Sequence, residues 1–322
     1  QFPWLRWALE PCAIGAVENP LFHPDAIAGW GDKTSASYAR FCARLRKVPY
    51  LTLEDGFFRS VGLGKARAPS VSCTLDGLGV YFDARQPSDL EVMLAQPVAP
   101  EVEARGRQLR SFVVEHRLSK YNHVPETPVR LPGTPGRRRI LLVDQVAGDR
   151  SLQGAGANAR TFATMRTEAA ALAAEDKADV FIKRHPDVVA GYAAGMLGDV
   201  SPPFLPVPEA GPHAILDEVD EVWTVSSQFG FDGLLRGRKV VTFGVPFYAG
   251  WGLTSDAPHA AAPFARPALQ RRSGHDLTLD ALAGIVIGVF PRYFDPDRRQ
   301  AVSAEEALER LVVWRTRQNN RV

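Results

Sequence analysis

The chain has 322 residues, of which 45% are hydrophobic and 23% are charged, a balance typical of globular proteins. Its formal net charge of +2 is too close to neutral to predict a surface for nucleic acid. The length is sufficient for two domains of ordinary size, each with its own core.

Three features of the sequence concern the compartment. The cysteines Cys12, Cys42 and Cys73 are widely spaced and form no CxxC motif, which favours reduced thiols in a cytoplasmic protein over a disulfide framework or a zinc site. The longest apolar run, at 282–290, is too short to span a bilayer. The start shows no signal segment, and because it is Gln1 rather than Met, we expect the chain to be part of a longer protein.

The first third predicts a strand, a helix and a strand. The runs at 26–31 and 48–55 have the composition of strands, and the segment 35–47 between them has that of a helix. Further along, the stretch 125–139 is rich in proline and glycine and has no periodicity. We interpret it as a linker between two domains.

The second half predicts a doubly wound α/β domain. Short, nearly continuous apolar runs that end in polar residues indicate parallel strands buried on both faces, at 138–145, 179–186, 221–227 and 239–244. An alanine-rich helix is expected at 159–177, between the first two strands. A last helix is expected at 303–318, where Ser303 and Glu306 have the spacing of a capping box.

Two basic clusters stand out locally. They lie at 136–139 and at 266–272. Such clusters are most often solvated faces, and contact with anionic lipid headgroups is the alternative.

Polar residues follow the ends of the predicted parallel strands, where ligands bind because loops and helix N-termini converge there. They are Glu54, Asp55, Gln145, Asp149, Lys183, Arg184, His185, Ser226 and Ser227. Each has a structural explanation as well: a helix cap or an Asx turn for the acids, a loop position for the histidine and a helix cap for the serines. Acids, a base and hydroxyls at so many strand ends together favour a binding site.

The residues of the second half predict a site for a small anion. Ser226 and Ser227 stand where a helix is expected to begin, so free amides and the helix dipole favour negative charge. Lys183 and His185 can add positive charge or a proton. The sequence has no GxGxxG, no GxxxxGK[ST] and no Asp-x-Asp placed to hold a metal on a diphosphate. We therefore expect one phosphate, bound by protein groups without a metal or a cofactor.

The carboxylates near this binding site predict that it also catalyses a reaction. Glu54, Asp55 and Asp149 are expected to face the phosphate from both sides of a cleft. Acids opposite a phosphate leaving group suit glycosyl transfer, in which one carboxylate stabilises or captures an oxocarbenium-like centre and another deprotonates the acceptor.

Four longer segments resemble the signature segments of the KpsC/LipA capsule polysaccharide family. They are LEDGFFRSVGLG (53–64), DQVAGDRS (144–151), KRHPDV (183–188) and TVSSQFGFDGLLRGRKVVTFGVPFYAGWGLT (224–254). The resemblance extends from 29 to 296. It implies a retaining β-Kdo glycosyltransferase that uses CMP-β-Kdo to build the Kdo linker of a capsule on a phosphatidylglycerol-type lipid, in the cytoplasm at the inner face of the cytoplasmic membrane.

The resemblance also implies an α/β, GT-B-like fold, in which two Rossmann-type domains face a central cleft. On this scheme 1–130 form the N-terminal, acceptor-side domain and 131–275 the C-terminal, nucleotide-sugar-binding domain. The remainder, 276–322, is expected to be a helical segment that packs back on the N-terminal domain. The E-D-G, H-P and S-S elements are similar in style to those of bacterial sialyltransferases, which also use a CMP-activated 2-keto acid sugar.

Individual roles follow from the same resemblance. Asp149 would be the nucleophile of a double displacement, and Glu54 or Asp55 would serve the acceptor hydroxyl. Further residues implied in binding the CMP moiety or the sugar are Gln145, Lys183, His185, Ser226, Ser227, Asp232, Arg59, Tyr248 and Trp251. The family usually has a glutamate where this chain has Asp232, and a contact with the ribose hydroxyls is expected there. Arg59 and Lys65 are candidates for the sugar carboxylate, with a charge partner for the acidic pair as the alternative.

Several alternatives stay open at this point. An inverting CMP-sugar transferase similar to sialyltransferases would use Asp55 as its base without needing Asp149, and a non-catalytic glycan-binding capsule-assembly module would need neither. The linkage can be 2,4 or 2,7, and the acceptor a terminal β-Kdo or the lipid glycerol. Members of the family often carry two transferase modules, and this chain has the size of one.

Overall fold

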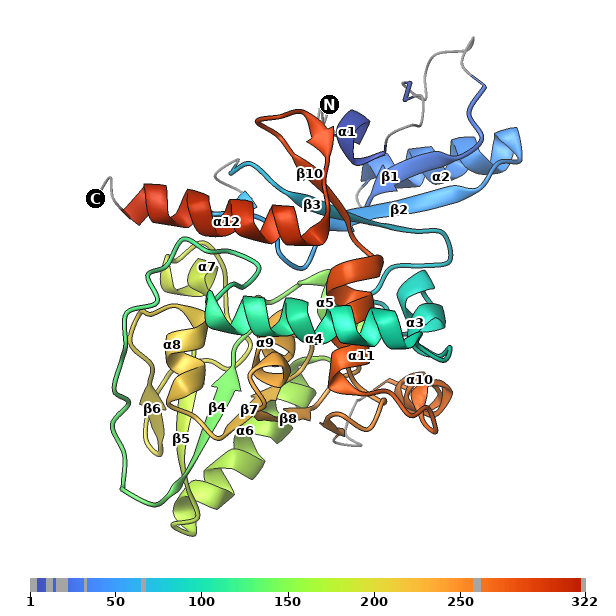
Figure 1. The fold of residues 1–322 in the computed structure, drawn as a ribbon. Coiled ribbons are helices and arrows are strands. Elements are labelled where there is room, and N and C mark those ends of the chain that lie inside the picture. The colour runs from blue at the N-terminus through green and yellow to red at the C-terminus, as the bar shows by residue number, and fades with distance from the viewer. Residues whose placement is uncertain are drawn as a thin grey trace. The chain divides into compact units, whose positions relative to one another are not determined.

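The computed structural model describes the residues at 5–9, 14–15, 23–31, 34–64, 68–256 and 262–319. The chain divides into two compact units, and each carries a sheet of its own (Figure 1). The first unit comprises 1–81, 87–123 and 280–322, and the second comprises 82–86 and 124–279. Most of the second unit is therefore inserted between two stretches of the first.

The sheet of the first unit mixes parallel and antiparallel pairs, in the order β1-β2-β3-β10-β11. The parallel strands β1 (Ile27–Trp30) and β2 (Tyr50–Asp55) are joined by helix α2 (Thr34–Arg46), which confirms the strand, helix and strand expected here. Strand β3 (Ser72–Asp76) runs antiparallel to β2, and β10 (Arg292–Asp295) runs antiparallel to β3. The antiparallel pairing of β3 departs from a doubly wound sheet, because no crossover helix separates β2 from β3 in the described part of the connection.

The other elements of the first unit are mainly helices: α1 (Leu5–Ala8), α3 (Asp89–Leu94), α4 (Pro100–Glu115), α11 (Leu279–Ala283), the π-helix η2 (Gly284–Val289), β11 (Gln300–Ala301) and α12 (Ala304–Asn319). The expected capping box is confirmed at α12: the Ser303 amide donates to Glu306 Oε2 at 2.9 Å, and the Glu306 amide donates to Ser303 Oγ at 3.2 Å. The Arg105 guanidinium joins α4 to α12 through two bonds to the Glu305 carboxylate, of 2.7 and 2.9 Å.

Helix α4 approaches η2 very closely at Gly106. A Cβ atom at this position would lie 2.0 Å from the backbone oxygen of Asp280 and 2.5 Å from the backbone nitrogen of Gly284. The two backbones therefore touch because neither glycine has a side chain.

The sheet of the second unit has the order β6-β5-β4-β7-β8-β9, with every described pair parallel. Its strands are β4 (Arg138–Val143), β5 (Ala178–Lys183), β6 (Phe204–Pro206), β7 (Glu221–Thr224), β8 (Lys239–Thr242) and β9 (Ser255–Asp256). The four strands expected from the sequence are confirmed. Each ends two or three residues earlier than its apolar-to-polar run, because the polar residues leave the ladder to form loops and helix caps.

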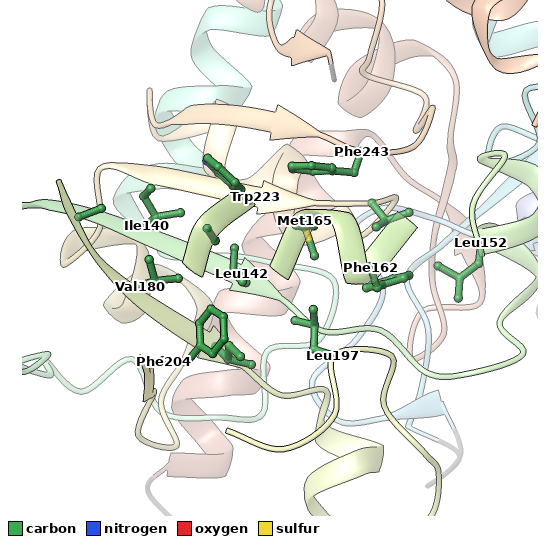
Figure 2. Close-up of a cluster of buried hydrophobic side chains, with 14 residues drawn as sticks. Ile140, Leu142, Leu152, Phe162, Met165, Val180, Leu197, Phe204, Trp223 and Phe243 are labelled. Carbon is green, nitrogen blue, oxygen red and sulfur yellow. The ribbon is translucent and has the colours of Figure 1, made fainter. Parts of the chain in front are cut away.

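The helices of the second unit are α5 (Arg150–Gly154), α6 (Ala159–Ala174), α7 (Pro186–Val189), α8 (Pro212–Asp217), α9 (Gln228–Leu235) and α10 (Ala265–Arg272). Helix α6, expected from its alanine content, is confirmed. It packs Phe162 and Met165 against Ile140 and Leu142 of β4 and Trp223 of β7 in one buried cluster (Figure 2). None of the helices in the described parts of the chain has the length and apolar character needed to cross a membrane.

The segment expected to be a linker is held against the second unit. The Glu126 carboxylate accepts hydrogen bonds from the amides of His213 and Ala214, at 3.3 and 2.7 Å, and so caps α8. Leu131 is buried, and its amide donates to Glu218 Oε2 at 3.1 Å. The segment has no regular secondary structure before β4, as its proline and glycine content predicts, but hydrogen bonds hold it against the second unit.

Several arginines of the two basic clusters make contacts within the second unit. In the first, Arg137 pairs with Asp176, and Arg139 Nη1 lies 2.9 Å from Glu218 Oε2. In the second, Arg272 is buried and donates to the carbonyl of Pro246 at 2.7 Å. These arginines are therefore engaged with the protein itself.

Gly106→Ala is expected to destabilise the protein by about 1–3 kcal/mol, although alanine is the better helix former, because the new methyl group must push α4 away from η2. Urea unfolding measures the difference. Ser111→Ala on the exposed side of the same helix is the control, with an expected change below about 0.5 kcal/mol. Equal stability of Gly106→Ala and the unaltered protein would contradict the close helix contact.

Candidate active site

In the second unit, the candidate site is centred on a reciprocal contact between Gln145 and Ser226. The Gln145 Nε2 atom donates to Ser226 Oγ and the Ser226 amide donates to Gln145 Oε1, both at 2.9 Å. Ser226 Oγ also lies 3.3 Å from Ser151 Oγ. Because Gln145 is buried and bonded to Ser226 in both directions, it positions this serine, and its own contact with the nucleotide stays a prediction.

Ser227 stands at the beginning of α9. Its hydroxyl accepts from the Phe229 amide at 3.2 Å, which makes it the N-cap of that helix. Its own amide donates to Thr224 Oγ1 at 3.2 Å. The sequence-based placement of the serine pair at a helix N-terminus is thus confirmed, and this position favours an anion.

Tyr248 and Trp251 support this turn from the interior. Tyr248 has no exposed surface, and its hydroxyl donates to the Ser227 carbonyl at 2.6 Å. Trp251 is 3% exposed and donates from Nε1 to the Phe247 carbonyl at 2.9 Å. Lining of a ligand pocket by these two rings was expected. Both rings are packed, with their polar tips on backbone acceptors inside the unit, and their contact with a ligand stays a prediction.

Asp149 is an exposed residue that begins α5. Its Oδ1 atom accepts from the Ser151 amide at 2.8 Å, so it caps the helix, and Gly148, with φ of +81°, makes the preceding turn. Among the described residues, Oδ2 has no hydrogen bond. One oxygen therefore fixes the carboxylate while the other is accessible.

The loop that carries Asp149 is fastened at its base by Asp144. This buried carboxylate accepts from the amides of Gln145, Met196 and Leu197, at 2.9, 2.8 and 2.9 Å. The Ala147 amide adds a bond to the Ala194 carbonyl at 2.9 Å. Asp144 was not singled out from the sequence, although it precedes Gln145 directly.

His185 caps α7 in a way that fixes its tautomer. The Asp187 amide donates to His185 Nδ1 at 3.1 Å, so the neutral ring carries its hydrogen on Nε2. Burial lowers the pKa of His185, and the charge of Lys183 lowers it further, against the opposing effect of nearby acids that include Asp149. The ring is therefore a neutral N–H donor at neutral pH, within electrostatic range of Asp149.

Lys183 and Asp232 interact electrostatically in this group. Burial lowers the pKa of Lys183, and Asp232 opposes that shift. The Lys183 ammonium lies 5.2 Å from the centre of the Phe229 ring, at the start of α9. Asp232 is buried and supports the charge of Lys183, and its contact with a ribose stays a prediction.

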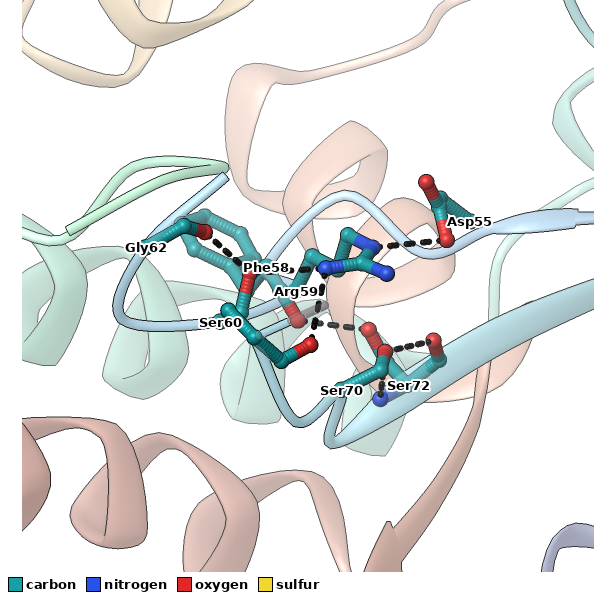
Figure 3. Close-up of polar contacts among 8 residues, drawn as sticks. Asp55, Phe58, Arg59, Ser60, Gly62, Ser70 and Ser72 are labelled. Carbon is teal, nitrogen blue, oxygen red and sulfur yellow. Dashed lines mark hydrogen bonds and ion pairs between the residues drawn. The ribbon is translucent and has the colours of Figure 1, made fainter. Parts of the chain in front are cut away.

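In the first unit, Glu54 and Asp55 end β2. Since neighbouring strand residues point to opposite faces, the two carboxylates do not form one pair. Asp55 Oδ1 lies 2.8 Å from Arg59 Nε, and Arg59 also donates from Nη1 to Ser60 Oγ at 3.0 Å (Figure 3). Glu54 lies beside Gly31, the residue after β1, where a Cβ atom would be 2.5 Å from Glu54 Oε1. The charge-partner alternative for Arg59 therefore describes the structure, and Lys65 is outside the described residues.

Lys120 is a further charged residue beside these acids. Its carbonyl accepts from the amides of Arg59 and Ser60, at 3.2 and 3.3 Å. Burial disfavours its charge, but Tyr81, Tyr121 and the two carboxylates together outweigh burial and raise the pKa of Lys120. Burial also raises the pKa of the Tyr81 hydroxyl to about 12. No local pattern marks Lys120 in the sequence, because the fold brings it to the acids from far along the chain.

Comparison with known sequences identifies similar capsule proteins. Residues 25–279 match the family described as "Capsule polysaccharide biosynthesis protein". The chain is 36% identical over 297 residues to the capsule polysaccharide modification protein LipA of Neisseria meningitidis serogroup B, across 89% of this chain and 41% of LipA. It thus spans less than half the length of that relative.

Two solved structures of KpsC from Thermosulfurimonas dismutans are similar over most of the chain. The beta Kdo 2,4 transferase is 37% identical with a TM-score of 0.79, across 89% of this chain and 87% of that one. The beta Kdo 2,7 transferase is 26% identical with a TM-score of 0.66, across 90% and 85%. The mixed α/β fold with parallel strands is common to these structures and this chain.

Gln145→Met is expected to lower stability by about 1–2 kcal/mol, because it removes two buried hydrogen bonds while keeping the length of the side chain. It should also speed amide hydrogen exchange at Ser226 by at least about tenfold. Gln153→Met, on the exposed side of α5, is the matched control and should change neither quantity. Unaltered exchange at Ser226 in Gln145→Met would show that the reciprocal contact does not hold this serine.

Proposed function

Because the chain belongs to the capsule polysaccharide biosynthesis family, we propose that it is a retaining β-Kdo glycosyltransferase that transfers Kdo from CMP-β-Kdo in capsule synthesis. The similarity to the Kdo transferases of KpsC supports the sugar and the reaction class. The greater similarity to the 2,4 transferase supports a 2,4 linkage. The acceptor is a Kdo-terminated glycolipid.

The observation that carries the proposal is the position of Asp149. It is exposed, fixed through one oxygen, and close enough to His185 to influence the pKa of that ring. The amide that Asp149 binds belongs to Ser151, whose hydroxyl contacts that of Ser226. A nucleophile beside a place for a phosphate leaving group is what a double displacement requires.

In the first displacement, Asp149 Oδ2 forms a bond to C2 of Kdo while the bond from C2 to the phosphate oxygen breaks and CMP leaves. The Ser226 and Ser227 hydroxyls and the Lys183 ammonium hold the phosphate, and the positive end of the α9 dipole stabilises the charge it gains. The neutral His185 ring donates from Nε2 to a phosphate oxygen. The protein groups alone bind the phosphate in this proposal.

In the second displacement, the acceptor hydroxyl attacks C2, its proton passes to a carboxylate, and the bond to Asp149 breaks. Two inversions at C2 give overall retention. The carboxylate that takes the proton is Glu54 or Asp55, of which Asp55 also pairs with Arg59 at 2.8 Å. The GT-B-like arrangement, with the two units facing a cleft, belongs to this proposal and rests on the family resemblance.

Asp149→Asn separates the role of Asp149 as the cap of α5 from its proposed role as the nucleophile. Asparagine caps a helix as well as aspartate does, so thermal stability should stay the same, while transfer should fall by about a thousandfold or more. The assay follows release of CMP from CMP-Kdo generated in situ, with a synthetic Kdo acceptor. Intact-mass analysis of the unaltered protein should reveal a covalent Kdo adduct that is absent from Asp149→Asn.

Asp199→Asn, an exposed substitution in the same unit, is the control and should keep full activity. Only a modest loss in Asp149→Asn, with no adduct in the unaltered protein, would instead support an inverting CMP-sugar transferase. No consumption of CMP-Kdo by the unaltered protein with any Kdo acceptor would favour a glycan-binding module.

His185→Asn tests the phosphate contact. The asparagine oxygen can replace Nδ1 as acceptor for the Asp187 amide, which preserves the α7 cap, but no atom replaces the Nε2 donor. Calorimetry should show about tenfold weaker binding of CMP with little change in melting temperature. CMP affinity equal to that of the unaltered protein would remove His185 from the proposed site.

A further inference from the structure

Helix α2 of the first unit is amphipathic in an inverted sense. Its buried residues are small: Ala36, Ala39, Cys42 and Ala43. Its large apolar residues are exposed instead, with Tyr38 at 51%, Phe41 at 60% and Leu45 at 71%. A helix on a globular core normally turns its large apolar side chains inward, so this arrangement needs another explanation.

The three large side chains form one stripe. Tyr38, Phe41 and Leu45 are three and four residues apart, so they lie on one side of the helix, opposite to the alanines that pack on β1 and β2. The alanine side lets the helix lie close to the sheet, next to Ile27. The opposite side is thus an apolar ridge that faces away from the core.

The charged residues of this helix and the residue that follows it all have the same sign of charge. The segment 34–47 contains Arg40, Arg44, Arg46 and Lys47 and no acidic residue. Arg44 and Lys47 are exposed. An apolar stripe with cations beside it is typical of helices that lie in a membrane interface, where apolar side chains enter the acyl boundary and cations meet anionic headgroups.

We propose that α2 docks the protein on an anionic lipid bilayer through Tyr38, Phe41 and Leu45, with Arg44 and Lys47 at the headgroups. A second copy of the chain is a poorer occupant, because a symmetric contact through α2 would bring two cationic helices together. The proposal uses none of the residues assigned to binding or transfer. It therefore stands or falls separately from the proposed function.

The test is flotation of the protein with phosphatidylcholine vesicles that contain or lack phosphatidylglycerol. The unaltered protein should bind the phosphatidylglycerol vesicles and bind less as salt rises. The double substitution Phe41→Ser and Leu45→Ser should weaken binding by at least about tenfold, and Arg44→Glu by about fivefold or more. Val313→Ser on the exposed side of α12 and Arg160→Glu on α6 are the matched controls and should bind as the unaltered protein does.

Melting temperatures and CMP affinity of the α2 variants should equal those of the unaltered protein, since the altered side chains are on the surface. The proposal is overturned if the unaltered protein does not bind phosphatidylglycerol vesicles, or if both α2 variants bind them as well as it does. It is also overturned if light scattering shows that the unaltered protein is a dimer and that the double substitution makes it a monomer, because a second copy then covers the ridge.

Discussion

The candidate site of the second unit depends on the two hydrogen bonds between Gln145 and Ser226. Gln145 follows β4 and Ser226 follows β7, and because these strands are neighbours in the sheet, the contact fixes one strand end against the other. Ser226 then meets Ser151 of α5, and the next residue, Ser227, begins α9. An amide suits this position because it donates and accepts at once and adds no charge next to a place for an anion.

Much of the second unit could be predicted from the sequence, because parallel strands buried on both faces leave continuous apolar runs that end where the chain turns polar. The first unit was less predictable. Its β1 and β2 show the same signal, but the antiparallel return of β3 and its pairing with β10, more than two hundred residues later, leave no trace in local composition. Local composition depends on residues that are neighbours along the chain, whereas the order of strands in a sheet depends on residues that are far apart in it.

In the candidate site, the structural and the functional explanations of a residue proved compatible rather than exclusive. Asp149, His185 and Ser227 each cap a helix, and each stands after a strand of the same parallel sheet. What the sequence could not reveal was side-chain direction: Tyr248 and Trp251 occupy a glycine-rich loop whose composition would be the same if the rings faced a ligand. The same limit applies to α2. Its sequence predicts an ordinary amphipathic helix, and only the burial of each side chain shows that the alanines face the core and Phe41 faces away from it.

The insertion of the second unit has a consequence for biosynthesis. Strand β3 leaves the ribosome long before β10, its neighbour in the finished sheet, and the whole inserted unit is translated between them. During that interval one edge of β3 has no permanent partner, and an open edge invites pairing with another nascent chain. The inserted unit needs no such late strand and can mature first. The sheet that begins first along the chain is thus the one that receives its last strands after the other is fully translated.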